Sequence, residues 1–276
     1  PVAQLAQTVK AGELGIDETW PSRFLIGLMQ LRPDVKPVMG SLPVEQSTMY
    51  KDEEERQRMR EASLINDECM DMVIHAIREG VTEKELALKV ENFFKARGCN
   101  SLGFSIVGMG KNGADPHHDA DETVLKEGDS IVIDIGAPFN HYWCDMTRTV
   151  FYKSVSEKQR EVYETVRRAN EAAIAKIKPG VAFKEFDLAA RKVIEDAGYG
   201  EYFTHRTGHS IGMKEHEKPP VASDCEVIAR PGMVFSIEPG IYLPGQFGVR
   251  VEDLVLVTED GCEVLNKYTK DLIVVE

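Results

Sequence analysis

Four acidic residues and one histidine stand at positions in the sequence where ionisable groups are costly. Asp134 ends the apolar run SIVIDIG, and Asp145 follows eleven residues later, beside TRTVF. Glu238 lies in FSIEPG, Glu252 lies within VRVEDLVLV, and His209 lies in TGHSIG. A buried carboxylate is unfavourable unless a cation or a set of donors compensates it. If these five groups converge in the fold, they require a cation.

Two divalent ions would neutralise four carboxylates. An oxygen-rich ligand set with one nitrogen suits Mn²⁺ best, with Co²⁺, Fe²⁺ or Zn²⁺ also possible, and it excludes a thiolate-rich zinc site. Two metals about 3.5 Å apart can hold a water between them, lower its pKa and polarise a carbonyl for attack. Each carboxylate taken alone is more simply explained as a capped or ion-paired structural group. The five together favour a metal site.

The elements that must position these residues follow from apolar periodicity and capping signals. Capping boxes at Thr82 with Glu85 and at Ser156 with Gln159 predict helix starts. The predicted helices cover 17–31, 52–80, 82–98, 156–178 and 183–197, and the predicted strands lie at 103–109, 129–136 and 146–152, with more in MVFSIEPGIYL, VRVEDLVLVT and CEVLN. The carboxylates thus fall in or beside strands.

An internal repeat relates the two halves of this pattern. Residues 77–98 align without gaps to residues 177–198, with seven identical positions. The strands that follow also match, so that Asp134 stands opposite Glu238. Two similar α+β halves related by a pseudo-two-fold axis would bring their carboxylates together between them. The repeat therefore predicts where the cations would lie.

Composition excludes several classes of partner. The 276 residues carry a net charge of −13 and no basic run, which argues against nucleic acid or an anionic membrane surface as a partner. The sequence has no apolar run of membrane-spanning length. Its five cysteines have no CxxC spacing, which predicts reduced thiols in a cytoplasmic protein. A proline-rich stretch after residue 31 predicts a boundary, and the start at Pro1 suggests a fragment of a longer product.

Four motifs carry a resemblance to a known family: VIDIGAPFNHYWCDMTRT, HRTGHSIGMKEHEKP, FSIEPGIY and GVRVEDLVLVT. They resemble the metallopeptidases of the pita-bread fold, and within these the Xaa-Pro branch of aminopeptidase P and Xaa-Pro dipeptidase (prolidase). The resemblance covers about residues 50–276. It implies an α+β catalytic domain over 49–276, with a curved antiparallel sheet covered by helices. Residues 1–48 would then be the end of an amino-terminal α/β domain plus a linker, and the protein would be a homodimer.

The resemblance also implies a role for individual residues. Asp134 would chelate one ion, Asp145 and Glu252 would bridge both, and His209 and Glu238 would hold the other. Arg250 would orient the bridging carboxylates. The expected catalytic residues are His117, His216 and Glu238, and the expected substrate-binding residues are His117, His205, His216 and Phe104. Three further histidines have simpler readings, His118 and His141 as solvated loop residues and His75 as a structural helix residue.

The expected reaction is hydrolysis of the peptide bond that precedes proline, by a metal-bridging hydroxide. Glu238 would shuttle the proton to the leaving nitrogen, and His216 would stabilise the oxyanion. The substrates would be short peptides with proline at the second position, and the sequence leaves open whether a dipeptidase or an aminopeptidase is encoded. Methionine aminopeptidase, a creatinase-like C–N hydrolase and a non-catalytic peptide-binding module are the alternatives. Lys214 and Glu215 depart from the family pattern and place charge beside His216, which bears on substrate preference.

Overall fold

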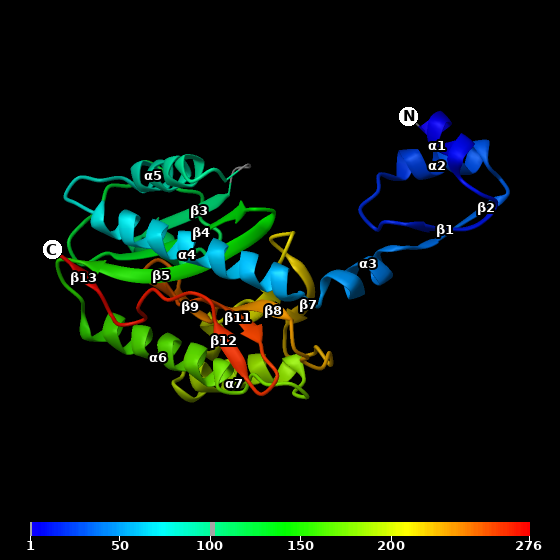
Figure 1. Ribbon diagram of the computed structural model, residues 1–276. Helices are drawn as coiled ribbons and strands as arrows, with labels where there is room; N and C mark the ends of the chain where they lie inside the picture. The colour runs from blue at the N-terminus through cyan, green and yellow to red at the C-terminus, as the bar shows by residue number, and fades with distance from the viewer. Residues whose placement is uncertain (1, 100–102) are drawn as a thin grey trace. The chain divides into compact units, whose positions relative to one another are not determined.

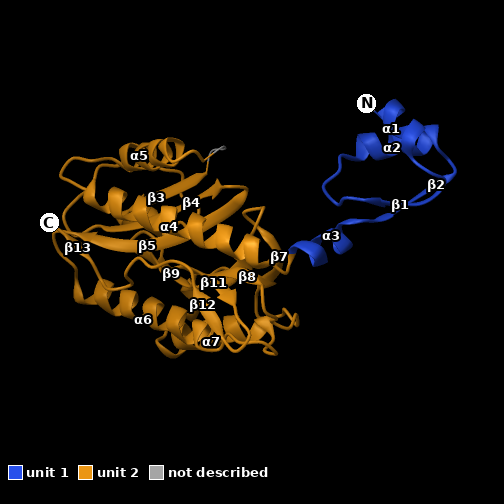
Figure 2. Cartoon of the chain, viewed as in Figure 1, with its two compact units in different colours: residues 1–48 blue, residues 49–276 orange. Residues whose placement is uncertain are grey.

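A computed structural model describes residues 2–99 and 103–276. The chain separates into two compact units, Pro1–Thr48 and Met49–Glu276 (Figure 2). The helices of the described chain are α1 (Val2–Thr8), α2 (Ser22–Leu31), α3 (Ser41–Thr48), α4 (Glu53–His75), α5 (Glu83–Ala96), η1 (Gly110–Ala114), α6 (Glu157–Ile174), α7 (Phe183–Asp196) and η2 (Gly200–Tyr202). None of these helices has the length and apolar character needed to cross a membrane.

The strands fall into four sheets. They are β1 (Gly12–Ile16), β2 (Val35–Met39), β3 (Phe104–Met109), β4 (Ser130–Phe139), β5 (Tyr142–Tyr152), β6 (Gly208–Ser210), β7 (Glu217–Val221), β8 (Val234–Ile237), β9 (Gly240–Leu243), β10 (Phe247–Arg250), β11 (Asp253–Val257), β12 (Cys262–Val264) and β13 (Val274–Val275). The sheet orders are β1-β2, β10-β9, β12-β11-β8-β6-β7 and β13-β5-β4-β3.

The first unit holds structure that the sequence analysis missed. The helix predicted over 17–31 begins only at Ser22, because residues 17–20 form a turn and Pro21 precedes the first helical residue. The proline-rich stretch contains strand β2 and helix α3. Pro37 is tolerated in β2 because that strand pairs only with β1, so a missing N–H on its other side costs nothing.

The first half of the second unit packs α4 and α5 on the β13-β5-β4-β3 sheet. Its core is built from helix residues such as Val73, Leu86 and Phe94 and from strand residues such as Ile131 and Ile133. Each fully buried side chain of this size contributes about 1.5–3 kcal/mol. In Figure 1 these helices cover one side of the sheets, and α6 and α7 cover the other.

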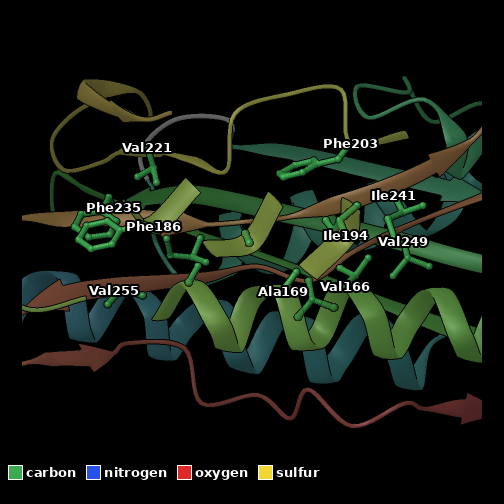
Figure 3. Close-up of a cluster of buried hydrophobic side chains, with 14 of the residues drawn as sticks. Val166, Ala169, Phe186, Ile194, Phe203, Val221, Phe235, Ile241, Val249 and Val255 are labelled. Atoms are coloured by element: carbon green, nitrogen blue, oxygen red, sulfur yellow. The ribbon is translucent and has the colours of Figure 1, made fainter. Parts of the chain in front are cut away.

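The second half packs α6 and α7 on β8, β11 and the β9–β10 hairpin. Val166 and Ala169 of α6 and Phe186 and Ile194 of α7 belong to one buried cluster with strand residues such as Phe235 (Figure 3). The rings of Phe186 and Phe235 stack with centroids 5.7 Å apart. The sheets therefore lie between two helical layers whose apolar faces both point inward.

The predicted repeat is present in the structure. Helices α5 and α7 each have 14 residues and start at Glu83 and Phe183, 100 positions apart. On α4, Asn66 donates to the carbonyl of Ile135 (3.0 Å), and on α6, Asn170 donates to the carbonyl of Ile237 (2.9 Å). These carbonyls directly adjoin Asp134 and Glu238. Each half therefore anchors its carboxylate-bearing strand to its long helix in the same way.

Several element boundaries in the second unit differ from those predicted: α6 ends at Ile174 instead of 178, β4 extends to Phe139 instead of 136, and two further differences have a clear local cause. Helix α4 ends at His75 instead of Gly80, because the chain turns through 76–80 and Gly80 adopts a φ of +76° that continues no helix. Strand β5 begins at Tyr142 instead of residue 146, because Asn140 and His141 form a tight hairpin with positive φ. The charge of Asp145 interrupted the apolar pattern and concealed the start of this strand.

Candidate metal centre and cavity

The β4–β5 hairpin brings the first two carboxylates to one face of a sheet. In the antiparallel register, Asp134 pairs with Thr147 and Asp145 pairs with Gly136. Residues 134 and 136 share a face because strand side chains alternate, so both carboxylates point the same way. Both are buried, with relative exposures of 8% for Asp134 and 3% for Asp145.

The second half contributes the other three residues. His209 lies in β6, Glu238 directly follows β8, and Glu252 lies between β10 and β11. The Nε2 atom of His209 is 3.6 Å from Asp145 Oδ2 and 3.5 Å from Glu238 Oε1. Asp145, His209 and Glu252 each offer a ligand atom, and these atoms lie within 4.8 Å of one another. The structure thus brings these predicted residues together from both halves.

Arg250 connects two of the carboxylates from the side. Its Nη2 donates to Asp134 Oδ2 (2.6 Å), and its Nε donates to the hydroxyl of Thr147 (3.0 Å). Thr147 in turn donates to Glu252 Oε2 (2.6 Å). The Nη1 atom of Arg250 donates to the hydroxyl of Tyr242 (2.7 Å). This buried network holds one oxygen of Asp134 and one oxygen of Glu252. It leaves the other oxygen of each of these two side chains free to bind a cation.

Electrostatics makes the cluster costly without a cation. Burial raises the pKa of Asp145 well above its ordinary value, and Asp134 and Glu238 raise it further. Burial likewise raises the pKa of Glu252 far above its usual range, with Asp145 the next cause. For Asp134, burial raises the pKa although the Arg250 guanidinium opposes the shift.

Glu238 is the exception within this cluster. Burial tends to raise the pKa of its carboxyl group, but His209 and His205 outweigh that effect, so the pKa of Glu238 falls below its ordinary value. The Ser236 hydroxyl also donates to Glu238 Oε1 at 3.0 Å, which favours the carboxylate.

The free atoms of the cluster fit a cation. Asp134 Oδ1, Asp145 Oδ1 and Glu252 Oε1 are buried and have no hydrogen-bond partner among the described residues. His209 donates from Nδ1 to the carbonyl of Ser210 (3.2 Å), which leaves the lone pair of Nε2 free. Buried polar atoms are nearly always satisfied. Three unsatisfied carboxylate oxygens beside an imidazole lone pair therefore indicate a site for divalent cations.

A cavity of about 510 Å³ opens over this cluster. Its lining includes all the residues predicted to act on the substrate, namely Phe104, His117, His205, His216 and Glu238. The ring of His216 lies against that of His209, with centroids 4.0 Å apart. His205 accepts a hydrogen bond at Nε2 from Tyr242 (2.9 Å) and so joins the Arg250 network.

The loop that carries His216 is anchored by a buried ion pair. Lys51 Nζ lies 2.8 Å from Glu217 Oε2, and both side chains are almost fully buried. Partial burial in the cavity wall, together with neighbouring His209, lowers the pKa of His216 to about 4. Burial also lowers the pKa of His205. Both rings are therefore neutral at pH 7.

Some of the residues around the cavity gave no signal in the sequence. Thr147 and Tyr242 link Arg250 to the carboxylates and to His205, and Arg206 lines the cavity. A Thr or Tyr within an apolar strand gives no signal of such a role. The interpretation of His118 as a solvated loop residue was wrong, because its Nε2 donates to buried Glu83 Oε2 at 2.7 Å.

Similarity to known proteins agrees with this geometry. Residues 57–259 match metallopeptidase family M24. An uncharacterised peptidase of Staphylococcus aureus (strain MSSA476) is 40% identical over 230 residues, which are 83% of this chain and 66% of that protein. The structure of the Xaa-Pro dipeptidase from Bacillus anthracis aligns at a TM-score of 0.95 and 35% identity, covering 99% of this chain and 78% of that chain. The X-Pro aminopeptidase from Thermotoga maritima aligns at 0.90 and 35% identity, covering 99% and 79%.

The two related halves with their helical layers define this protein as one of pita-bread fold. The chain belongs to metallopeptidase family M24. Both the resemblance and the fold class predicted from the sequence are thereby confirmed. The chain spans 66% of the length of the Staphylococcus aureus relative, slightly less than two thirds.

Proposed function

We propose that this chain is the catalytic part of a metal-dependent peptidase that cleaves the peptide bond preceding proline. One observation carries the proposal: three unsatisfied carboxylate oxygens and an imidazole lone pair lie at the wall of a cavity large enough for a short peptide. The names of the similar structures, an Xaa-Pro dipeptidase and an X-Pro aminopeptidase, support proline as the recognised residue.

Five residues would hold two divalent ions, with Mn²⁺ the expected metal. Asp134 would bind one ion, Asp145 and Glu252 would bridge both, and His209 and Glu238 would bind the other. Bound there, the ions would supply Lewis acidity toward a carbonyl group and lower the pKa of water.

The remaining steps belong to side chains of the cavity. Glu238, held as a carboxylate, accepts the proton of the attacking water and returns it to the leaving nitrogen. His216, neutral at pH 7, donates a hydrogen bond to the oxyanion that develops on the substrate carbonyl. His117 and His205 orient the peptide from the same cavity wall.

Apolar side chains of the cavity favour a proline ring. Phe104 lines the cavity beside Ile106 and Pro116, and its ring stacks near Trp143 with centroids 6.4 Å apart. An X-Pro bond has no N–H, so its binding site needs an apolar wall and no acceptor for that group. Phe104 is the residue we assign to this wall.

The arginine side chains of the cavity favour a dipeptide over a longer substrate. Arg250 is committed to Asp134, Thr147 and Tyr242. Arg206 lines the same cavity with an exposed side chain, and it forms no ion pair with another residue in the described part of the chain. It is therefore available for the free carboxylate of an Xaa-Pro dipeptide.

The test compares Ala-Pro, Ala-Pro-Ala, Ala-Ala-Ala and Met-Ala as substrates, with Mn²⁺ and with Co²⁺ added. We expect a preference of at least about 100-fold in kcat/KM for Ala-Pro-Ala over Ala-Ala-Ala, equivalent to about 2.7 kcal/mol of transition-state binding.

Ala-Pro should be cleaved faster than Ala-Pro-Ala, and Arg206→Ala should remove that difference. Faster cleavage of Met-Ala would indicate a methionine aminopeptidase. No cleavage of any peptide would favour a creatinase-like hydrolase or a binding module.

A further inference from the structure

Glu83 lies in the first turn of α5, and its side chain is fully buried. Its Oε1 accepts hydrogen bonds from the backbone N–H of Met109 (2.7 Å) and from Asn112 Nδ2 (3.0 Å). Its Oε2 accepts from His118 Nε2 (2.7 Å) and from the backbone N–H of Asp121 (3.1 Å). One carboxylate therefore ties the end of β3 and three points of the connection that follows it to a helix.

The segment that Glu83 holds, residues 109–121, carries two residues of the cavity wall. Pro116 and His117 both line the cavity, and the carbonyl of Pro116 accepts a hydrogen bond from Arg250 Nη1 (3.3 Å). The backbone N–H of His117 donates to Asp115 Oδ1 (3.0 Å), but its ring makes no hydrogen bond to any other residue in the described ranges. The position of that ring therefore depends on how residues 109–121 are held.

Glu83, His118 and Asp121 also resemble a set of metal ligands. The hydrogen bonds argue against that reading. Four donors already occupy both oxygens of Glu83, and an ionised carboxylate can only accept, so His118 carries a proton on Nε2. At Asp145 and Glu252, by contrast, one buried oxygen has no partner among the described residues. Both oxygens of Glu83 thus have hydrogen-bond partners, and its role is to hold the segment that supplies them.

We propose that Glu83 is a positioning residue that holds His117 in the cavity wall through residues 109–121. The proposal rests on the proposed function, because His117 affects turnover only if the cavity binds a peptide. Hydrogen bonds to an ionised acceptor are about twice as strong as neutral ones, so four of them fix the segment firmly. A displacement of about 1 Å at a reacting group can cost 10²-fold in rate.

The second half contains a counterpart that serves as a matched control. Asp187 on α7 is also fully buried, and its Oδ1 accepts from the backbone N–H (2.9 Å) and the hydroxyl (2.7 Å) of Thr207. Arg191 bonds the same carboxylate and also the carbonyl of His205 (3.0 Å). Asp187 therefore anchors the segment that leads to His209, and it has no contact with residues 109–121 among these hydrogen bonds.

The first test is a double-mutant cycle on the full chain with Mn²⁺ and Ala-Pro. Glu83→Gln should lower kcat about 100-fold with unchanged metal content, because an amide offers one acceptor to four donors. In a His117→Ala background the same change should alter kcat less than about 2-fold, because the residue that Glu83 positions is gone. Asp187→Asn should reduce kcat equally in both backgrounds. Multiplicative losses for Glu83→Gln and His117→Ala would overturn the proposal.

A second readout is independent of peptide hydrolysis. Glu83→Gln should accelerate amide hydrogen exchange over residues 109–121 and leave exchange over 203–209 unchanged. Asp187→Asn should accelerate exchange over 203–209 and leave exchange over 109–121 unchanged. Unchanged exchange over 109–121 in Glu83→Gln would show that Glu83 does not hold this segment. This result does not require peptide cleavage, so it is separable from failure of the proposed function. If Glu83→Gln does not fold, His118→Ala replaces it, with an expected loss of about tenfold for one hydrogen bond.

Discussion

At the scale of single residues, the centre consists of groups that are each unfavourable alone. Asp145 and Glu252 have buried oxygens without partners and raised pKa values. Thr147 holds the remaining oxygen of Glu252, and Arg250 holds one oxygen of the neighbouring Asp134. Preorganised groups of this kind need no reorganisation when a cation arrives.

Removing either of the two carboxylates that we propose to bridge the ions, Asp145 or Glu252, should abolish metal binding. We expect Asp145→Ala and Glu252→Ala to lose both metal ions and all activity, because each side chain would contact both ions. Metal content after dialysis, measured by plasma mass spectrometry, is the readout. Glu83→Gln, a change at a buried carboxylate outside the centre, should retain both ions. Two ions retained in Asp145→Ala would contradict the bridging role.

Metal affinity should depend on pH. Raised pKa values mean that the metal-free carboxyl groups of Asp145 and Glu252 hold protons above the ordinary carboxyl range, and metal binding must displace them. The affinity should therefore increase as pH rises toward the raised pKa values. Calorimetric titration in buffers of different ionisation enthalpy should detect proton release. A pH-independent affinity between pH 5 and 7 would contradict this account.

His216 should matter for turnover and not for folding. We expect His216→Ala to lower kcat by roughly 10²–10³ if its ring donates to the oxyanion. Metal content and Tm should remain unchanged, because the ring is largely exposed to the cavity. His75→Ala, a change at an exposed histidine of α4, provides the control. An unchanged kcat would remove His216 from the mechanism.

At the scale of elements, each half fixes its carboxylate-bearing strand to its long helix through a buried asparagine. Only the amide nitrogen of Asn66 forms a hydrogen bond, since its Oδ1 has no partner among the described residues. Asn170 is satisfied on both sides, because its Oδ1 accepts from Lys270 Nζ at 2.9 Å. The buried asparagine should therefore contribute more to the free energy of unfolding in the second half than in the first.

The two asparagines can be compared directly. Asn66→Ala and Asn170→Ala should each lower the free energy of unfolding by an amount on the order of 1–3 kcal/mol, because each removes a buried hydrogen bond to a strand carbonyl. Asn170→Ala should cost more, because Lys270 also loses an acceptor. Urea unfolding of the metal-free protein measures both. Glu61→Ala on the exposed side of α4 should have little effect, and an equal or smaller cost for Asn170→Ala would contradict the comparison.

At the scale of the whole molecule, neither half can form the centre alone. The first half supplies Asp134 and Asp145, and the second supplies His209, Glu238 and Glu252. Four carboxylates between two rigid layers repel one another unless cations lie among them. The bound ions should therefore stabilise the contact between the halves.

Metal removal should lower the melting temperature. A ligand present at about 1,000 times its Kd stabilises a folded protein by about 4.1 kcal/mol. Because folding raises the pKa values of Asp145 and Glu252, their favourable contribution in the metal-free protein is present at low pH and is lost as pH rises through the raised values. The Tm difference between metal-loaded and chelated protein should thus widen from pH 5 to pH 8. A difference that narrows would contradict the cluster electrostatics.

The sequence alone predicted the residues that the fold brings together at the cavity and most of the elements that carry them. Period and capping signals located α5 and α6, because Thr82 and Ser156 satisfy the first helical N–H groups locally. The gapless repeat placed Asp134 opposite Glu238, and the quoted motifs identified the family. These signals are local or periodic, so they are readable before the chain folds. The interpretation of residues 1–48 as the end of a larger domain stays a prediction.

The side chains that support the cluster are fixed by contacts between segments that are far apart in the sequence. Arg250 reaches Asp134 across 116 positions of sequence, and Glu83 meets His118 across 35. No local pattern encodes such pairs, because they depend on strand register and on the distance between packed layers. The misreading of His118 arose for this reason, since its partner lies on a helix that the loop reaches only in the folded chain. The roles of Thr147 and Tyr242 likewise exist only where strands distant in sequence become neighbours.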